Sequence, residues 1–189
     1  MLDVASNFLV KELNTFMLAR SGGAFGSALL SRVADDTGKW AIPDDQIGVA
    51  LVNIEEERAV RSQLPQAAYS NGRQVLLEPD VKLNLYLLFA AKFKQYDQGL
   101  RQLAQVLAFF QSHPVFTPER YPALDPRVEK LGVDLITLTF DQLNQLWTFV
   151  GTKQLPSLVY RARLVAVQDA EPSAIRPPIT TVGAAIEAT

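Results

Sequence analysis

The stretch VKLNLYLLFAAKF, residues 81–93, is the most apolar part of the chain, with a lysine near each end. A transmembrane helix needs about 20 apolar residues, so the run between Lys82 and Lys92 is too short to cross a bilayer. Side chains of a strand alternate between two faces. The alternation predicts a central strand with one face on the core and the other partly covered or wet. The apolar face would hold Val81, Leu83, Leu85, Leu87 and Phe89; the mixed face would hold Lys82, Asn84, Tyr86 and Leu88.

Apolar periodicity predicts six further elements around this strand. Helices are expected over residues 1–20, over 95–113, and over 139–153, where Thr139 and Gln142 have the spacing of a capping box. The other three elements are strands, in the segments IGVALVNIEEE from Ile47, GVDLITLTF at 132–140 and SLVYRARLVAV at 157–167.

The order of these elements predicts the fold class. Helix, strand, strand, helix, strand, helix, strand favours an α+β fold, a mostly antiparallel four-stranded sheet with helices packed on one face. The glycine- and aspartate-rich residues 21–45 indicate a long irregular connection, and residues 62–78 a hairpin-like excursion or a flexible loop. We expect one domain over residues 1–167 and a tail with little intrinsic structure over the proline- and alanine-rich residues 168–189.

Composition excludes several classes of function. The chain has 189 residues and a formal net charge of −2, without the basic surface that holds nucleic acid. It contains no cysteine, so disulfides and thiolate-bound metals are excluded. The first residues lack the basic region of a secretory signal peptide.

The sequence does not assemble an active site. The single histidine, His113, precedes a proline at a helix end, where a C-terminal cap is the favoured interpretation. The segment SGGAFGS at 21–27 lacks the lysine of a phosphate-binding loop. Trp147 lies on a helix stripe and is expected in the core, whereas Trp40, in a loop, could anchor a contact. We therefore expect no catalytic residues, no metal, no cofactor and no small-molecule substrate.

Charged residues supply the candidate interaction sites. Residues 55–57 are three consecutive glutamates, of which only Glu55 and Glu57 can share a strand face. Arg161 and Arg163 share a face of another predicted strand, which could be solvated or could receive glutamates of a neighbouring subunit. The candidate subunit-interface residues are Glu55, Glu56, Glu57, Arg58, Arg61, Arg161 and Arg163.

Four motifs occur together in a recognisable order: VNIEEER, LNLYLLFAA, FFQ-x-x-PVF and LNQLW followed by G-x-K-x-LPS. This set resembles the N-terminal domain of the cap proteins of extracellular contractile injection systems, phage-tail-like particles of the virulence-cassette and antifeeding-prophage type. The resemblance covers about residues 2–167. It implies a phage tail-terminator-like fold and a sixfold ring that ends tube polymerisation at the baseplate-distal end and contacts the last sheath layer. The implied partners are further copies of the chain, the inner tube protein and the sheath protein.

The resemblance leaves alternatives open. Another non-enzymatic adaptor or connector of the same particle is the second hypothesis, and an enzyme using His113 or the glutamates is a third. Longer relatives carry a further domain after the final strand, whereas this chain has only its proline-rich tail. The expected location is a particle assembled in the bacterial cytoplasm and then either released or anchored in the cell.

Overall fold

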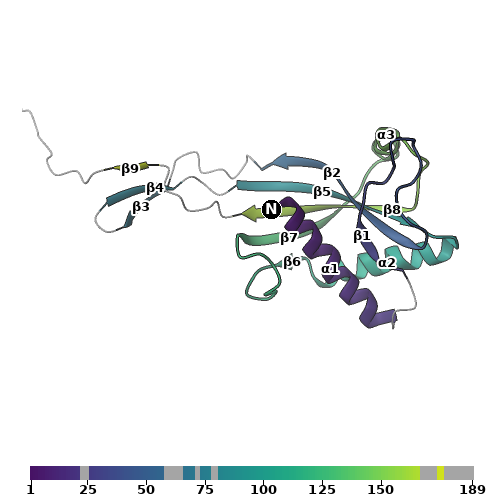
Figure 1. Cartoon of the computed structure of the whole chain (residues 1–189), viewed down its shortest axis with the longest axis horizontal. Helices are drawn as coiled ribbons and strands as arrows, with labels where there is room; N and C mark the ends of the chain where they lie inside the picture. Colours follow the sequence, from purple (N-terminus) through teal and green to yellow (C-terminus); the bar gives the residue numbers. More distant parts are fainter. Residues whose placement is uncertain (22–25, 58–65, 71–72, 78–80, 167–173, 177–189) are drawn as a thin grey trace, which may run out of the picture.

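A computed structural model describes residues 1–21, 26–57, 66–70, 73–77, 81–166 and 174–176. Three helices and nine strands follow one another along these residues (Figure 1). All three predicted helices and all four predicted strands are present. The elements are α1 (Leu2–Ser21), β1 (Ala28–Leu30), β2 (Gln46–Glu56), β3 (Gln66–Ser70), β4 (Arg73–Leu77), β5 (Val81–Lys92), α2 (Tyr96–Ser112), β6 (Val115–Phe116), β7 (Val128–Ile136), α3 (Phe140–Val150), β8 (Ser157–Ala166) and β9 (Ala174–Arg176).

The main sheet has six strands in the order β1-β2-β5-β8-β7-β6, so the predicted four-stranded sheet is wrong in strand number. The four predicted strands form its centre and are antiparallel to one another. The two added strands lie at the edges: β1 runs parallel to β2, and β6 is antiparallel to β7. These edge strands have three and two residues, too few for a periodic pattern, and pairing with a neighbour is what makes them strands.

The β5 strand lies at the centre of the main sheet, between β2 and β8, as predicted. Its predicted apolar face packs against α1 and α2, and Leu85, Leu87 and Phe89 are fully buried there. Val106 and Phe110 of α2 and Leu9 and Leu13 of α1 complete this larger core. The strand is therefore held by burial on one face and by backbone pairing on both edges.

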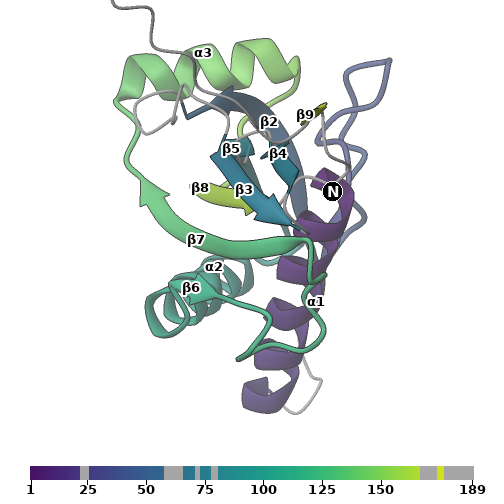
Figure 2. The same cartoon turned by 90° about the vertical axis from the view of Figure 1, so that its left-hand side faces the viewer.

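The third helix covers the opposite face of the sheet, which corrects the expectation that all helices pack on one face. Figure 2 shows α3 on one side of the strands and α1 and α2 on the other. Leu88 and Ala90 of β5 lie in a second, smaller core with Trp147 of α3, so the mixed face of β5 is partly covered. The predicted burial of Trp147 is confirmed, since its side chain is only 5% exposed.

Local caps fix the two ends of α3, and one close approach fixes the start of the segment before β1. The capping box of α3 is confirmed: the Thr139 hydroxyl accepts from the Gln142 backbone N–H, and Gln142 accepts in return. Gly151 ends α3 with φ +76°, a left-handed conformation that glycine adopts without strain. Gly26 lies against the backbone carbonyl of Asp45, leaving no room for a β-carbon.

Strands β3, β4 and β9 form a separate three-stranded sheet. The hairpin interpretation of residues 62–78 holds for β3 and β4, which pair from Ser70↔Arg73 to Gln66↔Leu77. β9 comes from the predicted tail and pairs with β4, while the rest of residues 168–189 lies outside the described residues. The domain boundary at residue 167 stays a prediction. Across the part of the chain that the structure describes, no helix has the length and apolarity needed to cross a membrane.

Candidate functional site

A row of polar side chains crosses four strands of the main sheet on the α3 side. The register places Glu55 of β2 beside Asn84 of β5, and Asn84 beside Arg163 of β8. Tyr86 of β5 lies beside Arg161, which in turn faces Asp134 of β7. We call this set the polar row; its members are Glu55, Glu57, Asn84, Tyr86, Arg161, Arg163 and Asp134.

The acidic end of the polar row is tied to β5 by two hydrogen bonds. The Tyr86 hydroxyl donates to a Glu55 carboxylate oxygen at 2.7 Å, and the Asn84 amide donates to Glu57 at 3.1 Å. The hydrogen bond to Glu55 raises the pKa of Tyr86, with burial adding to it. Tyr86 therefore stays neutral and acts as a donor that fixes the Glu55 carboxylate.

The basic end of the polar row is neutralised in part by Asp134. Its carboxylate lies 2.7 Å from an Arg163 guanidinium nitrogen and 3.5 Å from one of Arg161. The Arg163 side chain is nonetheless 54% exposed, so the pair is worth little in stability and part of its donor set faces solvent. Sequence reasoning missed Asp134 as a partner of the arginines. The alternation of residues 132–140 assigns Asp134 to a strand face, but it does not show that β7 lies beside β8.

Three polar atoms of the row are buried without a hydrogen-bond partner among the described residues. They are the Asn84 side-chain oxygen, the Arg161 Nε and the Asp134 Oδ2, the last of which still forms the ion pair with Arg163. Buried polar atoms are paired in the great majority of cases, because an unpaired one costs free energy. Because these atoms are buried, a partner can reach only the exposed groups of the polar row, above all the Arg163 guanidinium.

The structure brings together only some of the predicted interface residues. Glu55 and Glu57 share the polar row with Arg161 and Arg163, as the alternation predicted for each pair. Glu56 pairs with Leu83 and points to the other face. Arg58 and Arg61 lie outside the described residues. The role of all seven in subunit contacts stays a prediction.

The interpretation of His113 as a cap is confirmed. It forms the C-cap of α2, where its backbone N–H donates to Phe109 at 2.9 Å. Its ring Nδ1 lies 3.1 Å from the same carbonyl oxygen, and the ring stacks on Phe109. Within the described ranges, no three histidine, aspartate or glutamate side chains gather closely enough to hold a metal ion.

The loop tryptophan anchors an intramolecular contact. Trp40 Nε1 donates to the Lys153 carbonyl at 3.1 Å, and Lys92 lies 5.7 Å from its ring centroid. Lys92 also donates to the Ile42 carbonyl at 2.7 Å and pairs with Asp44 at 3.1 Å. The lysine at the end of β5 thus holds the connection before β2 against the sheet.

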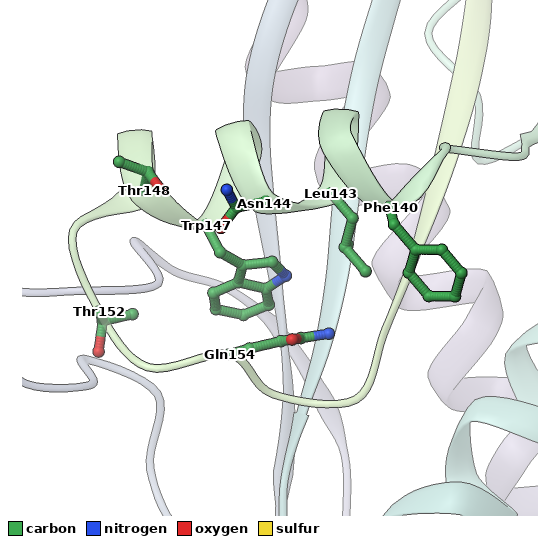
Figure 3. A pocket seen from close by; sticks show the side chains of 7 residues that line it. All are labelled: Phe140, Leu143, Asn144, Trp147, Thr148, Thr152 and Gln154. Carbon is green, nitrogen blue, oxygen red and sulfur yellow. The ribbon is translucent and has the colours of Figure 1, made fainter.

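A shallow hollow of about 360 Å³ lies along α3 and the loop after it (Figure 3). Trp147 and Leu143 point into it from the helix, Gln154 lies below the indole, and Phe140 stands at one end. Phe140 itself is 91% exposed at the start of α3. The hollow has no gathered charges, so it suits packing rather than chemistry.

Comparisons with known proteins identify a family and two solved structures that resemble this chain. Residues 5–181 match the Pvc16 N-terminal domain family. A search of curated proteins found no match. One similar solved structure is the PVC sheath/tube terminator of an extracellular contractile injection system in its extended state, at TM-score 0.63 and 18% identity. The match covers 95% of this chain and 62% of that chain.

A second solved structure is the tube-terminating cap of the anti-feeding prophage, at TM-score 0.61 and 18% identity, covering 98% of this chain and 61% of that one. This chain therefore spans about three fifths of the length of the two solved relatives. At this identity the likeness shows a shared fold. The family match covers most of the sequence, and the chain belongs to the Pvc16 N-terminal domain family.

Proposed function

We propose that this protein is a structural cap subunit of a contractile injection system. Copies would form a sixfold ring on the baseplate-distal end of the inner tube, end tube polymerisation and contact the last sheath layer. The observation that carries the proposal is family membership over residues 5–181, together with a fold likeness to two terminators over nearly the whole chain.

The polar row is the proposed recognition surface of this cap. It combines fixed carboxylates at one end with partly exposed guanidinium groups at the other, and so offers both signs of charge. A closed ring uses two different faces of each subunit, each matching the other. Glu55, Glu56, Glu57, Arg58, Arg61, Arg161 and Arg163 are the proposed contact residues, and Asp134 joins them as the partner of the arginines.

The proposed role requires no turnover, cofactor or small molecule. His113 is engaged as a helix cap, and the glutamates of the polar row are bound by Tyr86 and Asn84. The second candidate is another adaptor or connector of the same particle, which would share the fold but bind elsewhere. We place the protein in a phage-tail-like particle assembled in the bacterial cytoplasm.

Negative-stain electron microscopy of the full chain, alone and with its tube and sheath proteins, tests the proposal. Sixfold rings at one end of length-limited tubes are expected. Arg163→Ala should weaken the ring or sheath contact without loss of fold. The matched control is Arg101→Ala, an exposed arginine of α2 that is also paired with an aspartate, and it should leave assembly unchanged. A protein that stays monomeric and leaves tube length unlimited would contradict the cap and favour the adaptor.

A further inference from the structure

Among the described residues, no strand lies beside the outer edge of β2 from Leu51 to Ile54. β1 pairs only with Ile47–Val49, and the Ser31 N–H donates to the Val49 carbonyl at 3.1 Å. Beyond Ala50, no strand of the described residues lies along this side. The Ile47 N–H donates to the Ser27 carbonyl, away from β5. Every second residue of a strand directs its backbone groups to the same edge, so the N–H and C=O of Leu51 also point away from β5. A bulge between Leu51 and Asn53 then makes Ile54 the next outward residue.

The β7 strand has a matching open edge at the other side of the sheet. β6 pairs with Leu131 and Gly132, and the Val133 N–H donates to Pro114 at 2.8 Å. The described residues supply no strand beyond that point. By the same alternation Leu135 directs its backbone groups outward. Within the part of the chain that the structure describes, no strand thus pairs with the outward backbone groups of Leu51, Ile54 and Leu135, and natural proteins usually cover such edges.

The exposed apolar side chains of the two edges lie on one face. Leu51, Ile54 and Leu135 are 40%, 42% and 48% exposed. Their cross-strand neighbours Leu87, Leu85 and Tyr160 all belong to the larger core, so all three point to the α1 and α2 side. A hollow of about 380 Å³ adjoins the β2 edge there, lined mainly by apolar groups of Leu2, Leu30, Val49 and Leu51.

We infer that the open edge of β2 pairs with the open edge of β7 of a second copy of this chain, so that the main sheet continues from subunit to subunit. This inference rests on the proposed ring. Strand direction alternates along β2-β5-β8-β7, so β2 and β7 run antiparallel. Rotation of a copy about a ring axis that runs roughly along the strands preserves that direction and keeps α1 on the same side of the sheet. Leu135 then meets the Leu51–Ile54 stretch and its hollow.

The short edge strands are compatible with this contact. β1 covers the N-terminal half of β2 and β6 covers the middle of β7, so both lie outside the joined stretches. The register places Leu135 level with Leu51 across the sheet, through Tyr160 of β8 and Leu87 of β5, so pairing Leu135 with Ile54 instead offsets neighbouring subunits a short way along the strands. Closed sheets accommodate such an offset by tilting their strands about the axis. The contact is heterologous, as a ring requires.

Cysteine cross-linking tests the inference, because the chain contains no cysteine. The paired variants are Ile54→Cys with Leu135→Cys, and Leu51→Cys with Leu135→Cys. Three strand spacings, roughly 14 Å, separate β2 from β7 in one subunit. A disulfide needs Cα atoms within about 7 Å, so an intramolecular bond is excluded. We expect mild oxidation to give a ladder of covalent oligomers, ending at the ring size, in at least one pair.

Controls distinguish a specific edge contact from cross-links formed by random collision, and they distinguish failure of the edge contact from failure of the proposed cap function. The control pair is Leu18→Cys with Phe149→Cys. These two exposed residues lie on α1 and α3, away from the strand edges, and should give no ladder. Leu135→Lys should raise the concentration for half-maximal ring formation at least ~10-fold, with an unchanged circular dichroism spectrum. Rings that form without cross-linking in either pair would overturn the edge contact but keep the cap. Dimers from Ile54→Cys alone, or equal ladders in the control pair, would also overturn it. Absence of rings and of tube capping would overturn both.

Discussion

Replacing Leu85 with aspartate should unfold this protein at neutral pH. Leu85 is 1% exposed, at the centre of the larger core, between Ile54 of β2 and Ala162 of β8. Removing a buried leucine side chain to alanine costs about 2–5 kcal/mol. An unpaired polar group adds about 1–3 kcal/mol even when it is neutral. The sum, about 3–8 kcal/mol for the neutral carboxyl, reaches the lower part of the stability of an ordinary domain, about 5–15 kcal/mol, and ionisation at neutral pH adds to it.

The loss of stability in Leu85→Asp should grow with pH. Burial raises the pKa of the introduced carboxyl in the folded state above its unfolded value of about 3.9. The folded state then binds more protons, so stability is highest below that unfolded value. It falls by about 1.4 kcal/mol per pH unit until the pH passes the raised folded pKa. Leu85→Asn has a similar shape but no titrating proton, so it should lack this dependence.

Urea unfolding followed by circular dichroism between pH 4 and pH 8 measures the effect. Ile54→Asp is the matched control, since Ile54 lies directly opposite Leu85 on the same face but is 42% exposed. We expect this control to keep a midpoint near that of the original chain. Equal midpoints for Leu85→Asp and Ile54→Asp, or a folded Leu85→Asp protein at pH 8, would refute the placement of β5 in the core.

Three further predictions concern local features. Thr139→Ala removes the capping box and should lower stability by about 1 kcal/mol, whereas the exposed helical Thr148→Ala should not, in the same urea assay. Gly26→Ala should cost about 1–3 kcal/mol because its β-carbon meets the Asp45 backbone carbonyl, while Gly132→Ala, with open space around it, serves as the control. Hydrogen bonds from Arg127 lower the pKa of Asp125 to about 2, so its stabilising effect is present above the unfolded pKa and lost as pH falls through 2. Carbon-13 NMR should show this pKa, and Arg127→Ala should raise it; an unchanged value would contradict the assigned cause.

The central elements were predictable because each carries its own period. The twofold alternation of residues 81–89 and the stripes of α2 and α3 describe faces that any packing must bury. The capping residues Thr139 and Gln142 act within one turn, so they too can be read from the chain. For the same reason the sequence identified Trp147 as a core residue and His113 as a cap.

The candidate site was only half predictable. The charges at Glu55, Glu57, Arg161 and Arg163 could be assigned to strand faces by alternation. Their hydrogen-bond partners could not, because Tyr86, Asn84 and Asp134 reach them through register between strands distant in sequence. The family resemblance suggested what the protein assembles with, but it contained no information on which side chains meet.

By itself, the sequence determined the type and order of the main elements, the apolar face of the central strand and the absence of cysteine chemistry. These properties depend on neighbours within a few residues or on composition alone. Only the tertiary structure decided the six-strand order, the placement of α3 on the opposite face from α1 and α2, and the two open edges of the sheet. Strands of two or three residues have no stability of their own, and a sheet edge exists only after the strand order is set, because both depend on backbone pairing between distant segments.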